Sequence, residues 1–113
     1  MTEPVCEVIT ADDQDRLINF TRSLVEDRLA ACGQHLAPIR SIYRWNGSIQ
    51  DDREIRVAVH TRASLVPAIV GRANRQLPYE VPCVLALLVE TGNPDYLAWS
   101  IEQTGEPGAD DQA

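Results

Sequence analysis

The sequence contains no lysine, and all ten of its basic residues are arginine. Without lysine no side chain can form a Schiff base, which excludes that chemistry for every group except the terminal amine. No apolar run approaches the roughly 20 residues that a membrane helix needs. The opening residues, MTEPVCEVIT, lack the basic and then apolar pattern of a signal peptide. We therefore predict a cytoplasmic protein with no membrane partner.

Positive charge and cysteine are both scarce. The 17 acidic residues outnumber the 10 basic ones, which gives a formal net charge of −7 at pH 7. This balance disfavours attraction to a nucleic acid backbone, so we predict no nucleic acid partner. Cys6, Cys32 and Cys83 are widely spaced and form no CxxC pair, which excludes a zinc ribbon or a thioredoxin-type site. We expect three free thiols that pack as small buried groups.

The apolar residues that are present suffice for one core, since 44% of the 113 residues are hydrophobic. Residues 5–10 are rich in β-branched side chains and predict a strand. Asp12 and Asp13 are candidate caps for a helix whose apolar stripe recurs at three, four and seven residues as far as Cys32. Gly33 stands where a C-terminal helix glycine is expected.

Alternating apolar and polar side chains then predict a long antiparallel hairpin. The dipeptide Asn46-Gly47 is the strongest two-residue hairpin signal, because both turn positions need a positive φ. Residues 39, 41, 43 and 45 share one face of the first strand, and residues 55, 57, 59 and 61 share one face of the second. Pro38 cannot donate to a strand ladder, so we expect a bulge or a sheet edge there.

The rest of the chain predicts helix, strand and helix. Ser64 is the candidate cap of a second helix, in which Leu65, Ile69, Ala73 and Leu77 form the buried side. The apolar run 83–89 suits a strand that is covered on both faces. Asn93 and Pro94 then predict the cap and first position of a short last helix.

The element order β-α-β-β-α-β-α predicts an α+β fold, namely a ferredoxin-like sheet with a long hairpin and an extra C-terminal helix. We assign residues 1–104 to this domain and residues 105–113 to a disordered acidic tail. Helices on one face leave the other sheet face uncovered, and the hairpin carries Tyr, Trp and Ile in quantity. Oligomerisation through the sheet and hairpin is the economical way to cover that surface.

Five separated motifs resemble one family: RLAAC at 28–32, SIYRWNG at 41–47, HTRASL at 60–65, PYEVP at 78–82 and GNPDYLAW at 92–99. In order and spacing they resemble the CutA family of divalent-cation tolerance proteins, over residues 5–104. The resemblance implies a homotrimer related in architecture to the PII signalling proteins, with clefts between subunits. It also implies a role in tolerance of copper and other divalent metals, with no required cofactor and no accepted catalytic reaction.

The resemblance also indicates where copper-binding members hold their metal. They use a Cys before the Thr-Ala that ends the first strand, a His before Pro-Tyr and a Glu after Val-Pro. Those positions carry Ile9, Leu77 and Cys83 in this sequence. Cys83 is thus a weak candidate ligand for copper or another divalent cation, because one thiol alone does not make a site.

Other departures from the family pattern fall at residues 34–38 and at Asn46, Leu88 and Ser100. We interpret them as signs of a reshaped cleft between subunits. The predicted cleft residues are Gln34, His35, Leu77, Tyr79, Glu80, Cys83, Leu88 and Ser100. Four of these, namely His35, Tyr79, Glu80 and Cys83, are candidate catalytic groups.

Two functional hypotheses follow. In the first, the protein is a trimer for metal response or small-ligand sensing, whose partners are itself and a metal ion or small molecule. In the second, the same scaffold is repurposed as an enzyme, natural or engineered, with an apolar cleft that acts on a small organic substrate. Outside the cleft, we expect His60 to be a cross-strand partner for Glu or Tyr. We expect the acidic cluster of Asp51, Asp52 and Glu54 to be a solvated hairpin tip, with Arg–carboxylate pairs across subunits.

Overall fold

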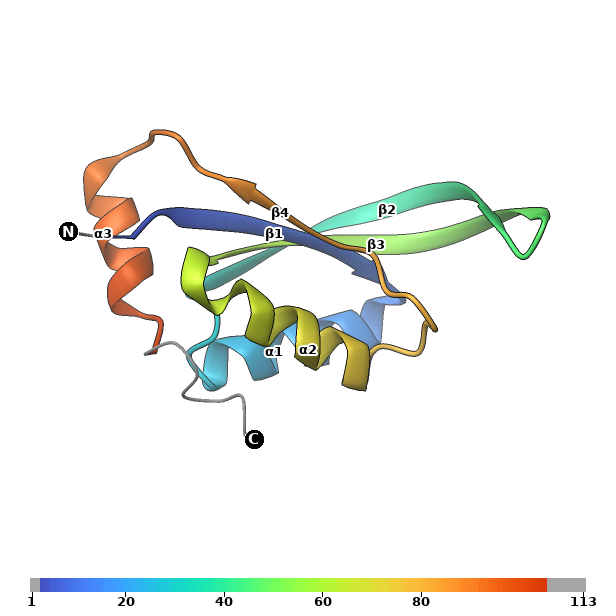
Figure 1. Ribbon diagram of the computed structural model, residues 1–113, viewed down its shortest axis with the longest axis horizontal. Helices are drawn as coiled ribbons and strands as arrows, with labels where there is room; N and C mark the ends of the chain where they lie inside the picture. Colours follow the sequence, from blue (N-terminus) through green and yellow to red (C-terminus); the bar gives the residue numbers. More distant parts are fainter. Residues whose placement is uncertain (1–2, 106–113) are drawn as a thin grey trace.

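The structure, a computed structural model, describes residues 3–105. One antiparallel sheet has the strand order β2-β3-β1-β4, with β1 at Val5–Asp12, β2 at Cys32–Trp45, β3 at Ser48–Arg62 and β4 at Val84–Leu88. Helices α1 (Gln14–Glu26) and α2 (Val66–Gln76) lie on one face, and α3 (Pro94–Glu102) lies at one end of the sheet (Figure 1). This arrangement confirms the predicted α+β, ferredoxin-like architecture with an extra C-terminal helix. Except for Gly105, the predicted tail lies outside the described residues.

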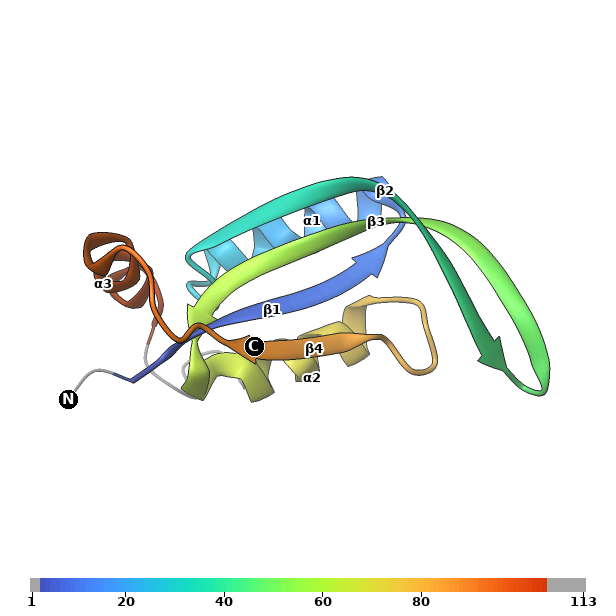
Figure 2. The same cartoon turned by 90° about the horizontal axis from the view of Figure 1, so that it is seen from above.

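The long hairpin formed by β2 and β3 is present, and its distal part extends beyond the helices (Figure 2). Asn46 and Gly47 adopt φ values of 50° and 81° at the turn, as their sequence predicts. The register shifts between Leu36 and Ile39, where β2 carries one more residue than β3. This is the bulge predicted at Pro38, and it lies on an edge strand because β2 has only one neighbour.

The core lies between the helices and one face of the sheet. Its members are the apolar residues that point from the strands toward α1 and α2, together with the inner faces of the helices. The stripe predicted on α2 and its flanks is confirmed, because Leu65, Ile69, Ala73 and Leu77 are all buried. The fully buried strand residues Val57 and Val59 continue the same core in β3.

Helix α1 ends at Glu26, earlier than the sequence pattern predicted. Arg28 takes a left-handed φ of 62°, and the Leu29 N–H donates to the Leu24 carbonyl oxygen at 2.8 Å. The Arg28 guanidinium donates in turn to the Glu102 carbonyl oxygen at 2.7 Å, so a contact with α3 holds this turn. The prediction that Gly33 ends the helix is wrong, because Gly33 lies inside β2.

The prediction that Ser64 caps the second helix is also wrong. Residues Ala63–Leu65 form a short 3₁₀ turn, and α2 begins at Val66 after Leu65, which makes no side-chain cap. The Ser64 hydroxyl donates instead to Glu3, at the start of the described chain. Asn93 does cap α3 as predicted, since its side chain accepts a hydrogen bond from the Asp95 N–H at 3.0 Å.

Strand β4 differs from its prediction in burial. It was expected to be covered on both faces, yet within one subunit Leu85, Leu87 and Leu88 are 58%, 52% and 70% exposed. The reason is its position, because β4 is an edge strand and the sheet face opposite the helices has no covering layer. Cys6, Cys32 and Cys83 are free thiols as predicted, but only Cys6 is buried.

Replacing Gly33 with alanine is expected to lower the free energy of unfolding by about 1–3 kcal/mol. The added Cβ would lie 2.2 Å from Cγ2 of Thr21 on α1, closer than packed atoms can approach. Unfolding in urea measures the change. Thr21→Ser removes that methyl group and keeps the hydroxyl, so adding Gly33→Ala to Thr21→Ser is expected to cost much less.

The matched control for this experiment is Gly92→Ala, where the nearest atom to the added Cβ is 3.8 Å away. An equal loss of stability for the two glycine variants, or no rescue by Thr21→Ser, would contradict the proposed close contact between β2 and α1.

Candidate functional site

A hollow of about 550 Å³ lies on the uncovered face of the sheet, between the hairpin and the loop that follows α2. Its walls combine apolar strand residues with aromatic rings and a few charged groups. The lining residues are Ile9, Thr10, Ala11, Ile39, Ser41, Tyr43, Trp45, Glu54, Arg56, Tyr79, Glu80, Val81, Cys83 and Leu85. This volume lies within the range of roughly 300–1,000 Å³ that is typical of small-molecule sites.

Strand register explains how these residues meet. Ile9 pairs with Ala58 and with Leu85, so three strands point the same set of side chains away from the helices. The extra residue of β2 between Leu36 and Ile39 shifts its alternation, and Ile39 is thereby paired with Glu54 on this same face. The bulge thus turns the odd-numbered residues that follow it in β2, namely Ile39, Ser41, Tyr43 and Trp45, toward the hollow.

Glu54 is the polar centre of the hollow. Its Oε1 accepts a hydrogen bond from the Ser41 hydroxyl at 2.6 Å, and its Oε2 accepts one from the Tyr79 hydroxyl at 2.5 Å. Burial, followed by the hydrogen bond to Glu54 and its negative charge, raises the pKa of Tyr79 well above its usual range. Tyr79 is therefore a hydrogen-bond donor at neutral pH and not a base.

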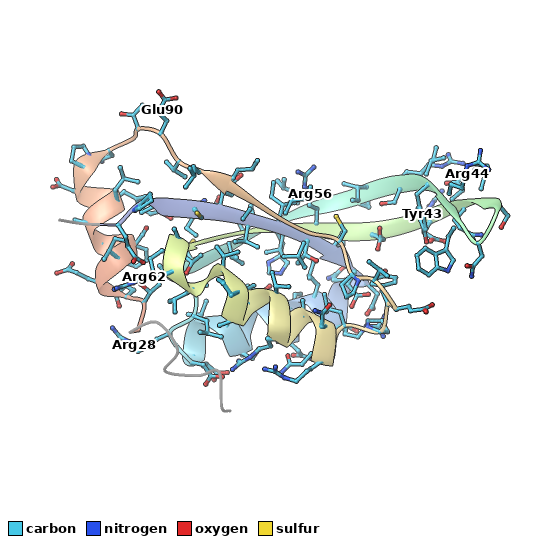
Figure 3. The ribbon with its side chains drawn as sticks, viewed as in Figure 1. Arg28, Tyr43, Arg44, Arg56, Arg62 and Glu90 are labelled. Atoms are coloured by element: carbon cyan, nitrogen blue, oxygen red, sulfur yellow. The ribbon has the colours of Figure 1, made fainter. Side chains whose placement is uncertain are left out.

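Farther along the hairpin, hydrogen bonds and ion pairs join the two strands. The Tyr43 hydroxyl donates to Asp52 at 2.5 Å, and Arg40 forms a bidentate ion pair with Asp51. The Arg40 guanidinium lowers the pKa of the Asp51 carboxyl. Tyr43 and Arg44 both lie on the distal half of the hairpin (Figure 3). The predicted acidic cluster is exposed at Asp51 and Asp52, and within the described residues its ion pair is the one between Asp51 and Arg40 of the same subunit.

Three of the eight predicted cleft residues, Tyr79, Glu80 and Cys83, line the hollow. The other five lie elsewhere in the subunit. Leu77 belongs to the core and Ser100 is fully buried on α3, whereas Gln34, His35 and Leu88 are exposed on the edge strands.

The two histidines occupy separate places. His60 Nδ1 lies 2.6 Å from the Tyr96 hydroxyl and its Nε2 lies 3.0 Å from a Glu7 oxygen, which confirms the predicted cross-strand role. His35 lies on the helix side of β2, where its Nε2 is 3.2 Å from the Thr21 hydroxyl. Cys32 points to the opposite sheet face, because three positions separate it from His35 along the strand.

A copper centre needs several metal-binding side chains in one place. Within residues 3–105, no three side chains of His, Cys, Asp or Glu are grouped so that they could hold a metal ion. Ile9 and Cys83, which stand where the resemblance implies copper ligands, do both line the hollow, but Leu77 lies in the core. The described residues of one subunit therefore do not fit a copper centre.

The sequence predictions missed most of the hollow, including Glu54, Arg56, Tyr43 and Trp45. A partial signal was present, because alternation had already grouped Ile39 with the aromatic hairpin residues on one face. What the sequence did not show is that the loop carrying Tyr79 closes over that face.

Comparison with known proteins identifies the family. The sequence profile of the CutA1 divalent ion tolerance proteins matches residues 5–103. The chain belongs to the CutA1 family. This confirms the resemblance drawn from the five motifs.

Three CutA proteins show the extent of the similarity. The chain is 40% identical over 102 residues to human protein CutA, which covers 90% of this chain and 56% of the human protein. It is 37% identical over 98 residues to the divalent-cation tolerance protein CutA of Thermus thermophilus. This match covers 87% of this chain and 95% of the Thermus protein. The crystal structure of CutA1 from Oryza sativa superimposes with a TM-score of 0.89 at 32% identity, covering 93% of this chain and 97% of that one.

The chain spans about half the length of the mouse and human CutA proteins that it matches. The names of CutA relatives differ in cell compartment, since one from Archaeoglobus fulgidus is called periplasmic and one from Arabidopsis thaliana chloroplastic. Within residues 3–105 of this chain, no helix has the length and apolar character needed to cross a membrane.

Proposed function

We propose that this CutA1-family protein is a cytoplasmic homotrimer that binds a small organic ligand in the hollow beside its hairpin. The observation that carries the proposal is the hollow itself, with apolar walls around the Glu54, Ser41 and Tyr79 hydrogen bonds. Such a site suits sensing of a ligand within a divalent-metal response. The free state of all three thiols favours a reducing compartment.

Binding is favoured over catalysis by the state of the candidate groups. Tyr79 is held protonated by its raised pKa, and its proton is already donated to Glu54. His35, the candidate acid or base, lies on the helix side of the sheet and not in the hollow. Glu80 and Cys83 do line the hollow, but within residues 3–105 neither forms a hydrogen bond with a second candidate group that could activate it. We therefore propose no reaction for this site.

The ligand-binding proposal is tested with a neutral aromatic probe, 3-phenylpropionamide, titrated into the full chain and followed by NMR chemical shifts. Ala11 lines the hollow, so Ala11→Trp is expected to fill it and weaken binding at least tenfold. The matched control is Ala98→Trp on the exposed surface of α3, which is expected to bind like the wild type. Absence of saturable binding to the wild type, or full affinity in Ala11→Trp, would contradict the proposal.

A trimer is proposed because a lone subunit exposes an unusual amount of apolar surface on its uncovered face. Leu36 and Leu87 lie on this face outside the hollow and are each more than half exposed, and β2 and β4 both present free edges. Exposed apolar patches and free edges of this kind mark interfaces between chains. That the oligomer has three subunits is what the family resemblance implies.

Light scattering at micromolar concentration is expected to give three times the 12.5 kDa mass of the chain. Leu87→Arg is expected to dissociate the trimer, because it places a charge on the proposed interface. Within its own subunit the new arginine lies beside Glu7, the residue paired with position 87 on β1, so its charge has a partner there. The control is Ile18→Arg on the outer side of α1, where the wild-type residue is 37% exposed. A stable monomer of the wild type, or an intact trimer in Leu87→Arg, would contradict the assembly.

We propose further that copper and other divalent cations bind weakly at most, with Cys83 the residual ligand. Support comes from the single exposed thiol in the hollow and from the apolar Ile9 beside it. Competition titrations with Cu(I) and Cu(II) chelators are expected to show no stoichiometric binding, and Cys83→Ser is expected to remove any residual Cu(I) signal. Tight binding of one copper per subunit that survives Cys83→Ser combined with His35→Ala would show that other residues hold the metal.

A further inference from the structure

Arg56 stands apart from the other arginines of this chain. Among residues 3–105, Arg56, Arg62 and Arg72 are less exposed than the other arginines. Arg72 is paired with Asp27, and Arg62 donates to the Thr104 hydroxyl and to two carbonyl oxygens near the end of α3. Within the described part of the chain, Arg56 has no hydrogen bond or ion pair, although it is half-buried. A guanidinium has five donor hydrogens, and removing it from water without partners is costly.

The carboxylate nearest along the strand does not compensate this charge. Glu54 lies two residues before Arg56 on the same face of β3, but its two oxygens accept from Ser41 and Tyr79. Those two hydroxyl groups hold the carboxylate in place. The guanidinium is not within ion-pair distance of it, and Arg56 remains a positive group in the wall of the hollow.

The rest of the hollow defines what Arg56 can bind. Figure 3 shows Arg56 on the side of the sheet away from α1 and α2, which is the side of the hollow. The walls on this side are mainly apolar, with Ile9, Ile39 and Leu85 from three strands and the ring of Trp45 from the hairpin. A ligand that matches them needs one negative group joined to an apolar body.

The charge of that group follows from its neighbours. Glu54 and Glu80 also line the hollow, so a doubly charged phosphate would meet two carboxylates and only one guanidinium. A carboxylate carries a single negative charge, and its planar pair of oxygens matches the guanidinium fork. We propose that the hollow binds a small organic carboxylate, with its carboxylate on Arg56 and its apolar body against Ile9, Ile39 and Leu85. This inference rests on the proposed ligand-binding function and specifies the class of ligand.

The test compares two probes of nearly equal shape, 3-phenylpropionate and its neutral amide, titrated by calorimetry into the full chain. The wild type is expected to bind the carboxylate at least tenfold more tightly than the amide. Arg56→Gln is expected to remove that preference by weakening carboxylate binding, with little change for the amide. The matched control is Arg53→Gln, because Arg53 lies on the opposite face of the same strand and is exposed.

The outcomes separate this inference from the function on which it rests. Equal affinity of the wild type for the two probes would overturn the carboxylate preference and leave the hollow as a ligand site. If neither probe binds, both proposals are overturned. Retention of the preference in Arg56→Gln would assign it to another group. A remaining explanation is that Arg56 binds a carboxylate of a second copy of this chain. Light scattering of Arg56→Gln checks it, because the variant would then lose the trimer, and that result would also overturn the inference.

Discussion

One extra residue in β2, between Leu36 and Ile39, determines which side chains the long hairpin presents to each face of the sheet. Side chains alternate along a strand, so a single inserted residue moves every later position to the opposite face. Before the bulge, Gln34 and Leu36 share the uncovered face with Ala58 and Arg56; after it, Ile39 shares that face with Glu54. Pro38 suits this place because it has no N–H to contribute to the ladder.

The two faces that result have different roles. On the helix side, β2 and α1 pack closely together. Gly33 of β2 has no side chain and so leaves room for Thr21 of α1. On the other side, the aromatic and apolar hairpin residues meet β1, β4 and the loop after α2, and the Glu54 carboxylate is fixed by two hydroxyl groups. That face stays open in one subunit, and it holds both the hollow and the apolar surface proposed for assembly.

Local signals predicted the parts of this fold that depend on neighbouring residues. The Asn46-Gly47 turn, the Asn93 cap and the buried side of α2 all follow from short-range chemistry, and the structure confirms them. The end of α1 was predicted wrongly because the apolar spacing continues to Cys32. The actual end is a turn with a left-handed φ at Arg28, whose side chain also contacts α3, 74 positions away in the sequence.

The candidate site was harder to predict for the same reason. Tyr79 and Glu54 are 25 positions apart, and only the fold shows that they form a hydrogen bond. Departures from the family pattern pointed to Leu77 and Ser100, which are buried inside the subunit, and gave no weight to Arg56. Sequence comparison detects changed positions, whereas an unpaired charge in a hollow is recognised only when its surroundings are known.

Strand register in solution is the most direct test of the account, because the hollow exists only if the bulge does. Cross-strand Hα–Hα and amide contacts measured by NMR on the isotope-labelled protein report this register. The account predicts contacts that pair Leu36 with Arg56 and Ile39 with Glu54. Contacts that pair Pro38 with Glu54 would show an uninterrupted ladder, would turn Tyr43 and Trp45 to the helix side, and would contradict the site described for this protein.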